Sequence, residues 1–316
     1  MKTIVIGGAG FIGSHLCEAL LNKGHEVVCL DNFSLGNSEH VNHLATNNSF
    51  TLVEADASDK SELEKAFAEY SPEYVFHLAA NSDIQASAGN PEVEYKNTYS
   101  TTFQILDCMR KFGVKKLFFS STSAVYGDKR DEVLDENTPN LSPISYYGAA
   151  KLGSEALISA FTYMNDLSSL VFRFPNVIGP GLTHGVVFDF MKRLSVEPEK
   201  LRILGDGRQT KPYIYVTDLV EAIVQFMDVD KGVTLYNIGV EGATSVTSIA
   251  DIVTEEMGLK DVNYEYTGGE GGWKGDVPRF KYCIDKVHKA GWSAKYTSDE
   301  AVRMTVRANL GGSVRE

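Results

Sequence analysis

Two side chains four positions apart, Tyr147 and Lys151, could form the centre of a catalytic site. On a helix, residues at this spacing share one face, so the phenol and the ammonium can converge on one bound molecule. A free phenol has a pKa of about 10, and a nearby positive charge stabilises the phenolate. A drop of roughly three units, worth about 4 kcal/mol, would make Tyr147 a general base near neutral pH. This spacing also arises by chance, so the pair alone does not decide the function.

A hydroxyl for the same site is expected from the segment FSSTSAVYG at residues 119–127. Thr122 stands at the end of the strand expected over 116–121. Sites in parallel sheets lie at the carboxyl ends of the strands, where Thr122 can meet Tyr147. The serine and threonine cluster can instead be polar capping of a strand end, but its position relative to Tyr147 favours catalysis.

A glycine-rich segment, GGAGFIG at residues 7–13, directly follows the first expected strand. Gly7 permits a tight turn, Gly10 lets the backbone approach a diphosphate, and Gly13 lets the next helix pack closely. Phe11 and Ile12 begin that helix, whose free N–H groups and positive end suit the same diphosphate. Such a segment between a strand and an amphipathic helix is typical of a dinucleotide site.

The preferred dinucleotide is indicated by Asp31, which follows Gly13 by 18 residues at the end of the second expected strand. A carboxylate there accepts hydrogen bonds from both adenosine ribose hydroxyls and repels a 2′-phosphate, which favours NAD over NADP. The alternative interpretation is that Asp31 is a turn residue with no role in cofactor binding. Residues expected along the cofactor are Asp56 and Ala57 at the adenine, and the small segment Leu78, Ala79 and Ala80.

The residues above lie on expected strands and helices, which alternate regularly in the first half of the chain. This alternation predicts an α/β fold, a Rossmann-type doubly wound parallel sheet, with a smaller mixed α/β substrate-binding domain. We expect an NAD-binding domain over 1–175 and a nucleotide-sugar-binding domain over 176–316, with some segments returning to the first. The expected strands are 3–6, 26–30, 50–53, 74–78, 116–121 and 169–174, and the expected helices are 11–22, 60–70, 97–112 and 147–164. In the second part we expect a strand over 235–239, helices over 218–227 and 246–257, and a flexible loop or plain surface connection over 268–275.

Composition limits the partners of the chain. With 42 acidic and 30 basic side chains among 316 residues, the formal charge of −12 argues against nucleic-acid binding. The four cysteines form no C-x-x-C pair, which favours a reduced, cytoplasmic location over disulfides or a zinc site. We expect no secretion signal, membrane span or metal centre.

The residues above, taken together, resemble the extended short-chain dehydrogenase/reductase family, and within it the nucleotide-sugar epimerases of the UDP-glucose 4-epimerase type. The resemblance covers nearly the whole chain. The motifs that carry it are Gly7-x-x-Gly10-x-x-Gly13, Asp31-Asn32, Asp56, His77-Leu78-Ala79-Ala80, Asn97, Ser120-Ser121-Thr122, Tyr147-x-x-x-Lys151, RFPNVIGP at 173–180, YIYVTD at 213–218 and YNIG at 236–239.

This resemblance implies a role for each group. Tyr147 would be the base, Lys151 would hold the nicotinamide ribose, and Thr122 would bond the reacting sugar oxygen. Asn32, Asn97 and Ser120 would line the cofactor. The residues implied for the nucleotide diphosphate are Asn176, Val187, Lys211, Tyr213 and Asp276. The family also implies a homodimer formed through helices 97–112 and 147–164.

The reaction is narrowed by Ser123 and Ala124. Related dehydratases carry an Asp-Glu pair here, and related decarboxylases a glutamate at the second position. Neither carboxylate is present, so the sequence favours a UDP-sugar 4-epimerase acting on UDP-glucose and UDP-galactose, or on their N-acetyl forms. The remaining alternatives are a reductase, dehydratase or 2-epimerase of the same family, or a catalytically silent NAD-binding scaffold.

Several departures from the family pattern concern the substrate. Lys211 replaces a frequent arginine, Pro175 replaces an aromatic residue, and Trp273 stands where a diphosphate arginine is expected. Arg279 or Lys274 would then supply the missing charge. Phe280 is expected beside the sugar 2-position, where bulk accompanies a preference for UDP-glucose and UDP-galactose.

Three other features have simpler interpretations. His40 and His43 lack partners for a tetrahedral metal site and are expected on a solvated face. His77 is expected to be a packed, hydrogen-bonded histidine. Tyr146 must point away from the site and is expected to pack elsewhere.

Overall fold

The computed structural model describes residues 1–269 and 275–311, and the chain divides into two compact units. Most of the loop expected over 268–275 therefore lies outside the described residues. Unit 1 comprises Met1–Gly127, Asn140–Arg173 and Val220–Tyr236, and unit 2 comprises Asp128–Pro139, Phe174–Leu219 and Asn237–Glu316. The assignment of 1–175 to the cofactor and 176–316 to the nucleotide sugar stays a prediction.

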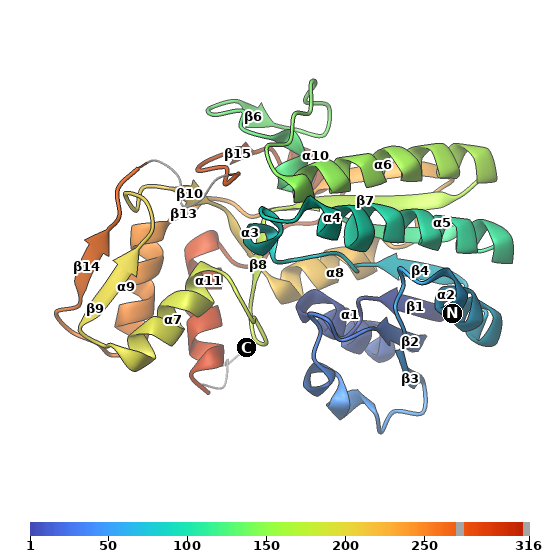
Figure 1. Ribbon diagram of the computed structural model, residues 1–316, viewed down its shortest axis with the longest axis horizontal. Coiled ribbons are helices and arrows are strands. Elements are labelled where there is room, and N and C mark those ends of the chain that lie inside the picture. Colours follow the sequence, from blue (N-terminus) through green and yellow to red (C-terminus); the bar gives the residue numbers. More distant parts are fainter. Residues whose placement is uncertain (270–274, 312–316) are drawn as a thin grey trace. The chain divides into compact units, whose positions relative to one another are not determined.

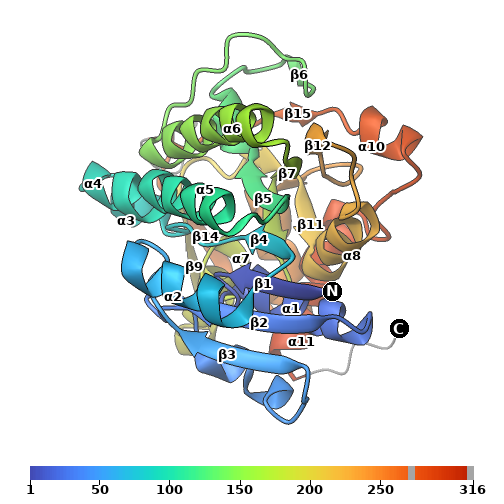
Figure 2. The ribbon, with the colours of Figure 1, turned by 90° about the vertical axis from the view of Figure 1, so that its right-hand side faces the viewer.

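Unit 1 is built on a seven-stranded sheet with the order β12-β7-β5-β4-β1-β2-β3 (Figure 1; all seven strands are labelled in Figure 2). Its strands are β1 (Lys2–Ile6), β2 (Glu26–Asp31), β3 (Phe50–Glu54), β4 (Tyr74–His77), β5 (Lys116–Thr122), β7 (Ser168–Phe174) and β12 (Gly232–Asn237). The run from β3 to β5 is parallel throughout. The predicted Rossmann-type fold is confirmed.

The register of the parallel strands brings the segments that follow β1, β2, β4 and β5 to the same edge of this sheet. Ile6 pairs with Leu30 and with His77, and His77 pairs with Phe119. The residues that follow these four in the chain therefore emerge together at the carboxyl ends of the strands, as expected for a parallel sheet.

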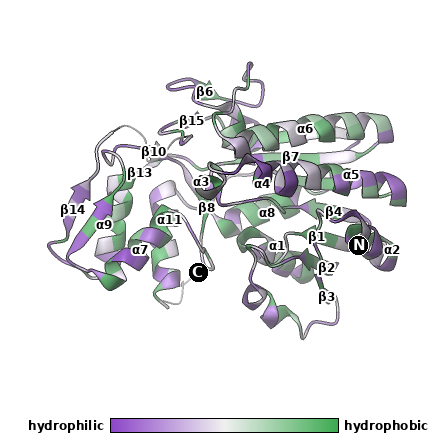
Figure 3. Cartoon of the chain, viewed as in Figure 1, coloured by the Kyte–Doolittle hydropathy of each residue, from purple (hydrophilic) through white to green (hydrophobic). Residues whose placement is uncertain are grey.

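Helices cover both faces of the sheet. In Figure 2, α2, α5 and α6 lie on one face, and α1 with the end of α8 lies on the other. The helical elements of unit 1 are α1 (Phe11–Asn22), η1 (Ser38–His40), η2 (Asn42–Leu44), α2 (Lys60–Tyr70), α3 (Ile84–Ser87), α4 (Pro91–Glu94), η3 (Tyr95–Ser100), α5 (Thr101–Phe112), η4 (Ser123–Tyr126) and α6 (Tyr146–Asn165). Hydrophobic strands and helix faces form the core, and the exposed sides of α2 and α5 are hydrophilic (Figure 3).

One expected helix is divided. The segment 97–112 was expected to be a single α-helix, but α5 begins at Thr101 and is preceded by the π-helical turn η3. A π turn contains more residues than an α turn, so it changes which side chains face the core.

Unit 2 contains short two-stranded sheets and helices. Its strands are β6 (Val133–Leu134), β8 (Asn176–Ile178), β9 (Lys200–Ile203), β10 (Thr210–Lys211), β11 (Tyr213–Tyr215), β13 (Thr244–Ser245), β14 (Asn263–Tyr266) and β15 (Lys281–Tyr282). Its helices are α7 (Val186–Val196), α9 (Val246–Glu256), α10 (Asp285–Lys289) and α11 (Ser298–Asn309), while α8 (Val216–Phe226) begins in unit 2 and ends in unit 1. The mixed α/β character matches the expectation. The strand expected over 235–239 is instead β12, whose residues extend the unit 1 sheet beside β7.

Candidate active site

The glycine-rich turn after β1 has the steric design that the sequence predicts. A Cβ on Gly7 would come within 2.6 Å of the Ala79 backbone nitrogen, and Gly7 has φ +83°. A Cβ on Gly13 would come within 2.1 Å of the Gly7 carbonyl oxygen. Side chains at either position would push apart β1, α1 and the segment after β4, so both positions require glycine.

Asp31 lies at the end of β2 and accepts hydrogen bonds from this turn. The Ala9 N–H donates to Asp31 Oδ2 at 2.9 Å, and the Phe33 N–H donates to Oδ1 at 2.9 Å. Burial raises the pKa of Asp31, and the backbone hydrogen bonds act in the opposite direction. The nearby His40 Nδ1 lies 3.1 Å from the Ala9 carbonyl oxygen, which places this histidine on the turn.

The residues predicted around the adenine gather at the ends of β2 and β3. Partial burial alone would raise the pKa of Asp56, but hydrogen bonds from Ser58 and Asn32 leave it below its ordinary value. The Ala57 side chain is buried beside them. Asp56 and Asn32 therefore contact one another, and their roles at the cofactor stay predictions.

The place of Asn97 at the cofactor stays a prediction. Its side chain is exposed on η3, whereas that of the next residue, Thr98, is fully buried. Both residues belong to the π-helical turn η3, in which Thr98 is buried.

Tyr147 and Thr122 meet because of the way α6 begins. The Ser145 hydroxyl caps this helix by accepting from the Gly148 N–H at 3.1 Å. A Cβ on Gly148 would come within 2.7 Å of the Ala124 carbonyl oxygen, so glycine lets the helix approach η4 closely. Thr122 lies at the end of β5, immediately before η4, and hydrogen-bonds to the Tyr147 phenol. Tyr146 points outward and is 52% exposed, so it is not packed as expected.

Lys151 lies one helical turn after Tyr147 and is fully enclosed. Its Nζ donates to the Ser120 carbonyl oxygen at 2.7 Å and lies 4.7 Å from the centre of the Phe119 ring. Burial lowers the pKa of Lys151 to about 7, although the charges of Glu94 and Glu155 act in the opposite direction. The lysine therefore titrates near neutral pH.

The protein's own groups raise the pKa of Tyr147, so the expected lowered value would depend on the charge of the bound cofactor. Burial of the phenol has the largest effect, the Glu94 carboxylate adds to it, and the hydrogen bond with Thr122 opposes both. The expected lowering of the pKa relied on Lys151 together with the positively charged nicotinamide, and it did not include the desolvation or the carboxylate. The protein alone thus keeps this phenol protonated.

Two groups of buried polar residues were not foreseen. Glu94 accepts hydrogen bonds from Asn81 Nδ2 and from Thr98 Oγ1, each at 2.8 Å. The sequence signal for Glu94 was the acidic segment PEVEYK, which does not distinguish Glu94 from the exposed Glu92.

His77 is packed and hydrogen-bonded as expected, with Nε2 2.9 Å from Thr102 Oγ1.

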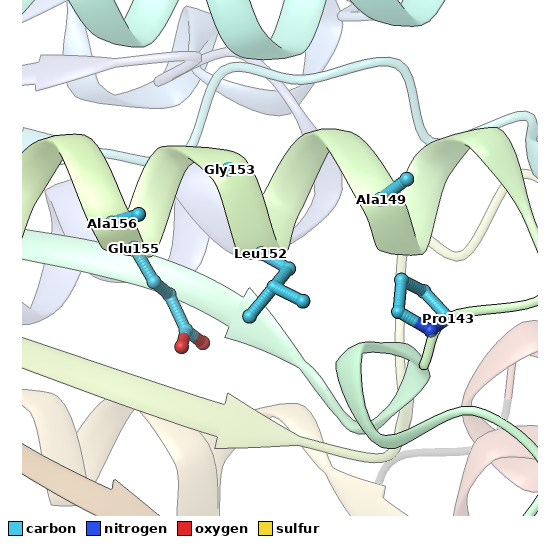
Figure 4. A pocket seen from close by; sticks show the side chains of 6 residues that line it. All are labelled: Pro143, Ala149, Leu152, Gly153, Glu155 and Ala156. Atoms are coloured by element: carbon cyan, nitrogen blue, oxygen red, sulfur yellow. The ribbon is translucent and has the colours of Figure 1, made fainter. Parts of the chain in front are cut away.

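The second unforeseen group joins α6 to β5 and β7. Glu155 of α6 binds Arg173 of β7, and Ser121 Oγ also donates to Glu155 Oε1. On the adjacent surface of α6, Pro143 and Leu152 are among the residues that line a largely apolar pocket with Glu155 at its edge (Figure 4).

In unit 2 the residues predicted for the diphosphate form two contacts. Asn176 pairs with Tyr213 in the register of β8 and β11, and its side chain hydrogen-bonds to the tyrosine phenol. Lys211 Nζ forms an ion pair with Asp276.

The other two predicted diphosphate residues are separate from these contacts. Val187 is buried in the first turn of α7, so only its backbone could meet a ligand. Arg279 is 63% exposed and lies 3.7 Å from Asp131. Lys274 and Trp273 lie outside the described residues.

Residues 3–239 match the model of the NAD dependent epimerase/dehydratase family. The chain belongs to this family. It is 31% identical over 327 residues to the UDP-glucose 4-epimerase of Bacillus subtilis, covering 95% of this chain and 94% of the relative. Its fold is similar to the crystal structure of UDP-glucose 4-epimerase from Thermotoga maritima with UDP-glucose, with a TM-score of 0.89, 32% identity and 98% and 99% coverage of the two chains. The complex of the Thermus thermophilus enzyme with NAD gives a TM-score of 0.88, 31% identity and the same coverage.

These comparisons confirm the resemblance and the cofactor, NAD. The glycine-rich turn of this family member fits that cofactor, because a Cβ on Gly10 would meet only the Gly7 carbonyl oxygen within 4 Å, at 3.2 Å. Helix α1 has no side-chain cap and no acidic residue in its first turn, so its N–H groups can bind a diphosphate. In the part of this chain that the structure describes, no helix is long and apolar enough to cross a membrane.

Proposed function

We propose that this chain is a UDP-sugar 4-epimerase that interconverts UDP-glucose and UDP-galactose. The observation that carries the proposal is the meeting of Thr122 and Tyr147 at the carboxyl end of β5, with Lys151 buried one turn further along α6. NAD, which the glycine-rich turn and Asp31 would hold, would supply reversible hydride transfer at C4 of the sugar, as the interconversion of the two epimers requires. No metal is needed for this chemistry.

Each protein group has a defined task in this proposal. The Tyr147 oxygen takes the proton of the sugar 4-hydroxyl and later returns it. Thr122 hydrogen-bonds to the same phenol and so fixes the point at which the sugar oxygen is received. Lys151 is held by the Ser120 carbonyl and provides positive charge beside the phenol and a donor for the cofactor ribose.

The residues after Thr122 support epimerisation over dehydration. Dehydration requires a base for the C5 proton and an acid for the departing C6 hydroxyl. Ser123 and Ala124 begin η4 at that point, and neither has a carboxylate. A 4-epimerase requires no further acid or base there.

We further propose that unit 2 holds the nucleotide diphosphate. The paired Asn176 and Tyr213 supply polar groups, and Lys211 supplies positive charge with Asp276 beside it. Arg279 is the candidate for the charge that the family pattern leads us to expect at Trp273. Phe280 is proposed to limit the space beside the sugar 2-position.

We also propose a homodimer formed through α5 and α6. Large side chains on these helices are exposed in the single chain, among them Phe103 at 42%, Tyr163 at 87% and Met164 at 76%. Burial of such groups against a second copy would form a four-helix contact. Light scattering of the purified protein would reveal a dimer, and a monomer at all concentrations would contradict it.

The substrate proposal is tested by incubating the purified protein separately with UDP-glucose and UDP-N-acetylglucosamine and resolving the product epimers. We expect UDP-galactose to form without net NADH turnover. Stoichiometric consumption of cofactor would instead indicate a reductase. Tyr147→Phe should keep the fold and lower turnover by roughly 10²- to 10⁴-fold. Unchanged activity in that variant would eliminate Tyr147 as the base.

A further inference from the structure

Glu94 is a carboxylate enclosed within unit 1, at the end of α4. Its exposed fraction is 1%, and its two oxygens accept hydrogen bonds from Asn81 Nδ2 and Thr98 Oγ1. Both donors are themselves buried, with Asn81 7% exposed and Thr98 fully enclosed. Two neutral donors thus hold a group that is rarely buried unless it is paired.

No direct cation partner accompanies this carboxylate. Within the residues that the structure describes, no lysine or arginine lies within 4.0 Å of the Glu94 oxygens. A buried carboxylate without an ion pair is costly to fold, so a purely structural role explains it poorly. Helix α4, which ends at Glu94, and the following η3 both pack against α6, the helix that carries Tyr147 and Lys151. The Glu94 charge acts on both of these groups.

The elements around α4 present few other charges to Glu94. Helix α4 packs against α3, η3 and α6. Helix α3 has no titratable side chain, and the side chains of Tyr95 and Lys96 on η3 are exposed. The exposed Asp83 and Glu92 flank the same region, whereas Tyr99 of η3 and Glu155 of α6 are half-buried. Tyr147 and Lys151 are therefore the enclosed groups that this charge can influence most strongly.

We propose that Glu94 is a positioning residue that sets the protonation state of the Tyr147 and Lys151 pair, a role that rests on the proposed base function of Tyr147. The Glu94 carboxylate favours the ammonium form of Lys151 and the neutral phenol of Tyr147. Asn81 and Thr98 fix the carboxylate so that its charge acts from a constant position. The phenol is thereby kept protonated until further positive charge enters the site.

This role predicts a specific effect of removing the charge. Glu94→Gln preserves the size of the side chain, and its amide can still bond to Asn81 and Thr98, so we expect the fold to be retained. The phenolate should then form more easily, and the ammonium should lose its proton more easily. The titration midpoints of Tyr147 and of Lys151 should therefore both move to lower pH. A residue that only anchored α4 would lower thermal stability without moving either titration.

The test is an ultraviolet titration of the Tyr147 phenol in the full-length protein with its cofactor, obtained as the difference between each protein and its Tyr147→Phe counterpart. We expect Glu94→Gln to move the titration midpoint down by roughly one pH unit, the size of effect that one nearby charge has. Glu94→Asp keeps the charge and should restore most of the original midpoint. Glu92→Gln removes an exposed carboxylate from the same helix and should leave the midpoint in place.

The pH profile of kcat provides a second measurement. Both limbs of the profile should move to lower pH in Glu94→Gln and stay in place in Glu92→Gln. An unmoved phenol midpoint in a folded Glu94→Gln protein would overturn the inference, as would a midpoint in Glu94→Asp lowered as far as that in Glu94→Gln. The titration requires no substrate, so it is independent of whether the protein epimerises UDP-sugars.

Discussion

Glu155 of α6 and Arg173 of β7 form a two-point ion pair inside unit 1. Arg173 Nε donates to Glu155 Oε1 at 3.0 Å, and Nη2 donates to Oε2 at 2.6 Å. The Glu155 side chain is only 12% exposed and the Arg173 side chain only 5%. Tyr126 accepts a further bond from Arg173 Nη1 at 3.0 Å. This pair joins the helix that carries Tyr147 and Lys151 to a strand of the sheet.

Breaking this pair should strongly destabilise the protein. Glu155→Gln leaves a buried guanidinium without its counter-charge, and we expect a loss of about 3 to 5 kcal/mol in the free energy of unfolding. Asp228→Asn removes the partner of Lys116 in an exposed ion pair and should cost about 1 kcal/mol or less. Denaturant unfolding of the two variants measures the difference. Equal losses of unfolding free energy in the two variants would show that the buried pair stabilises the fold no more than the exposed pair does.

Lys151 should make stability depend on pH. Its pKa in the folded protein is about 7, whereas in the unfolded chain it has the ordinary value of about 10.4. Between these values the unfolded chain binds the extra proton, so the free energy of unfolding from this group rises with pH across that window. Below pH 7 the folded protein must bury the ammonium, and the penalty is fully present.

The matched variant for this effect is Lys151→Met, which keeps an unbranched side chain without the charge. We expect it to flatten the rise in unfolding free energy between about pH 7 and pH 10. Thermal unfolding in a series of buffers measures the slope in both proteins. The same slope in both would contradict a lowered pKa for Lys151.

The sequence was most informative where local geometry alone fixes the residue type. Gly7 and Gly13 could be predicted because the turn leaves no space for a Cβ, and Thr122 because parallel strands end at the same edge. The start of the helix expected at residue 97 could not be predicted correctly, because the π turn that precedes α5 is not visible in the sequence.

Electrostatic effects between residues far apart in the chain could not be predicted from the sequence either. The raised pKa of Tyr147 depends on its burial and on Glu94, which is far from it in the sequence. Similarly, Glu155 and Arg173 come from a helix and a strand whose register only the fold establishes. Such contacts depend on packing between elements, which periodicity does not encode.

Asp31 should control both cofactor affinity and cofactor choice. Asp31→Asn removes the charge that would bond the adenosine ribose, while one oxygen remains for the Ala9 or Phe33 N–H. A charge-assisted hydrogen bond contributes about 1.5 to 3 kcal/mol, so ADP-ribose should bind roughly 10- to 100-fold more weakly. Calorimetry measures this affinity. The preference for NAD over NADP should also decrease, and an undiminished preference would assign the selection to another residue.

Arg279 should contribute to binding of the nucleotide diphosphate. Because it is 63% exposed, its removal is not expected to disturb folding. We expect Arg279→Ala to weaken UDP binding by roughly tenfold through loss of a charge-assisted bond. Arg202→Ala removes another exposed arginine of unit 2 and should have no effect. If Arg279→Ala binds UDP as tightly as the native protein, the anchor is a different residue.

Phe280 should limit the size of the sugar 2-substituent. Its ring is half-buried and packs edge-on against Tyr282, with ring centres 5.7 Å apart, so it occupies a defined volume. Phe280→Ser would open that volume, and we expect the ratio of kcat/KM for UDP-N-acetylglucosamine over UDP-glucose to rise by about tenfold or more. Phe280→Tyr keeps the ring and should leave the ratio close to the native value. Coupled assays of the two epimers give both constants. A ratio that is the same in the serine and tyrosine variants would show that the 2-substituent does not meet this side chain.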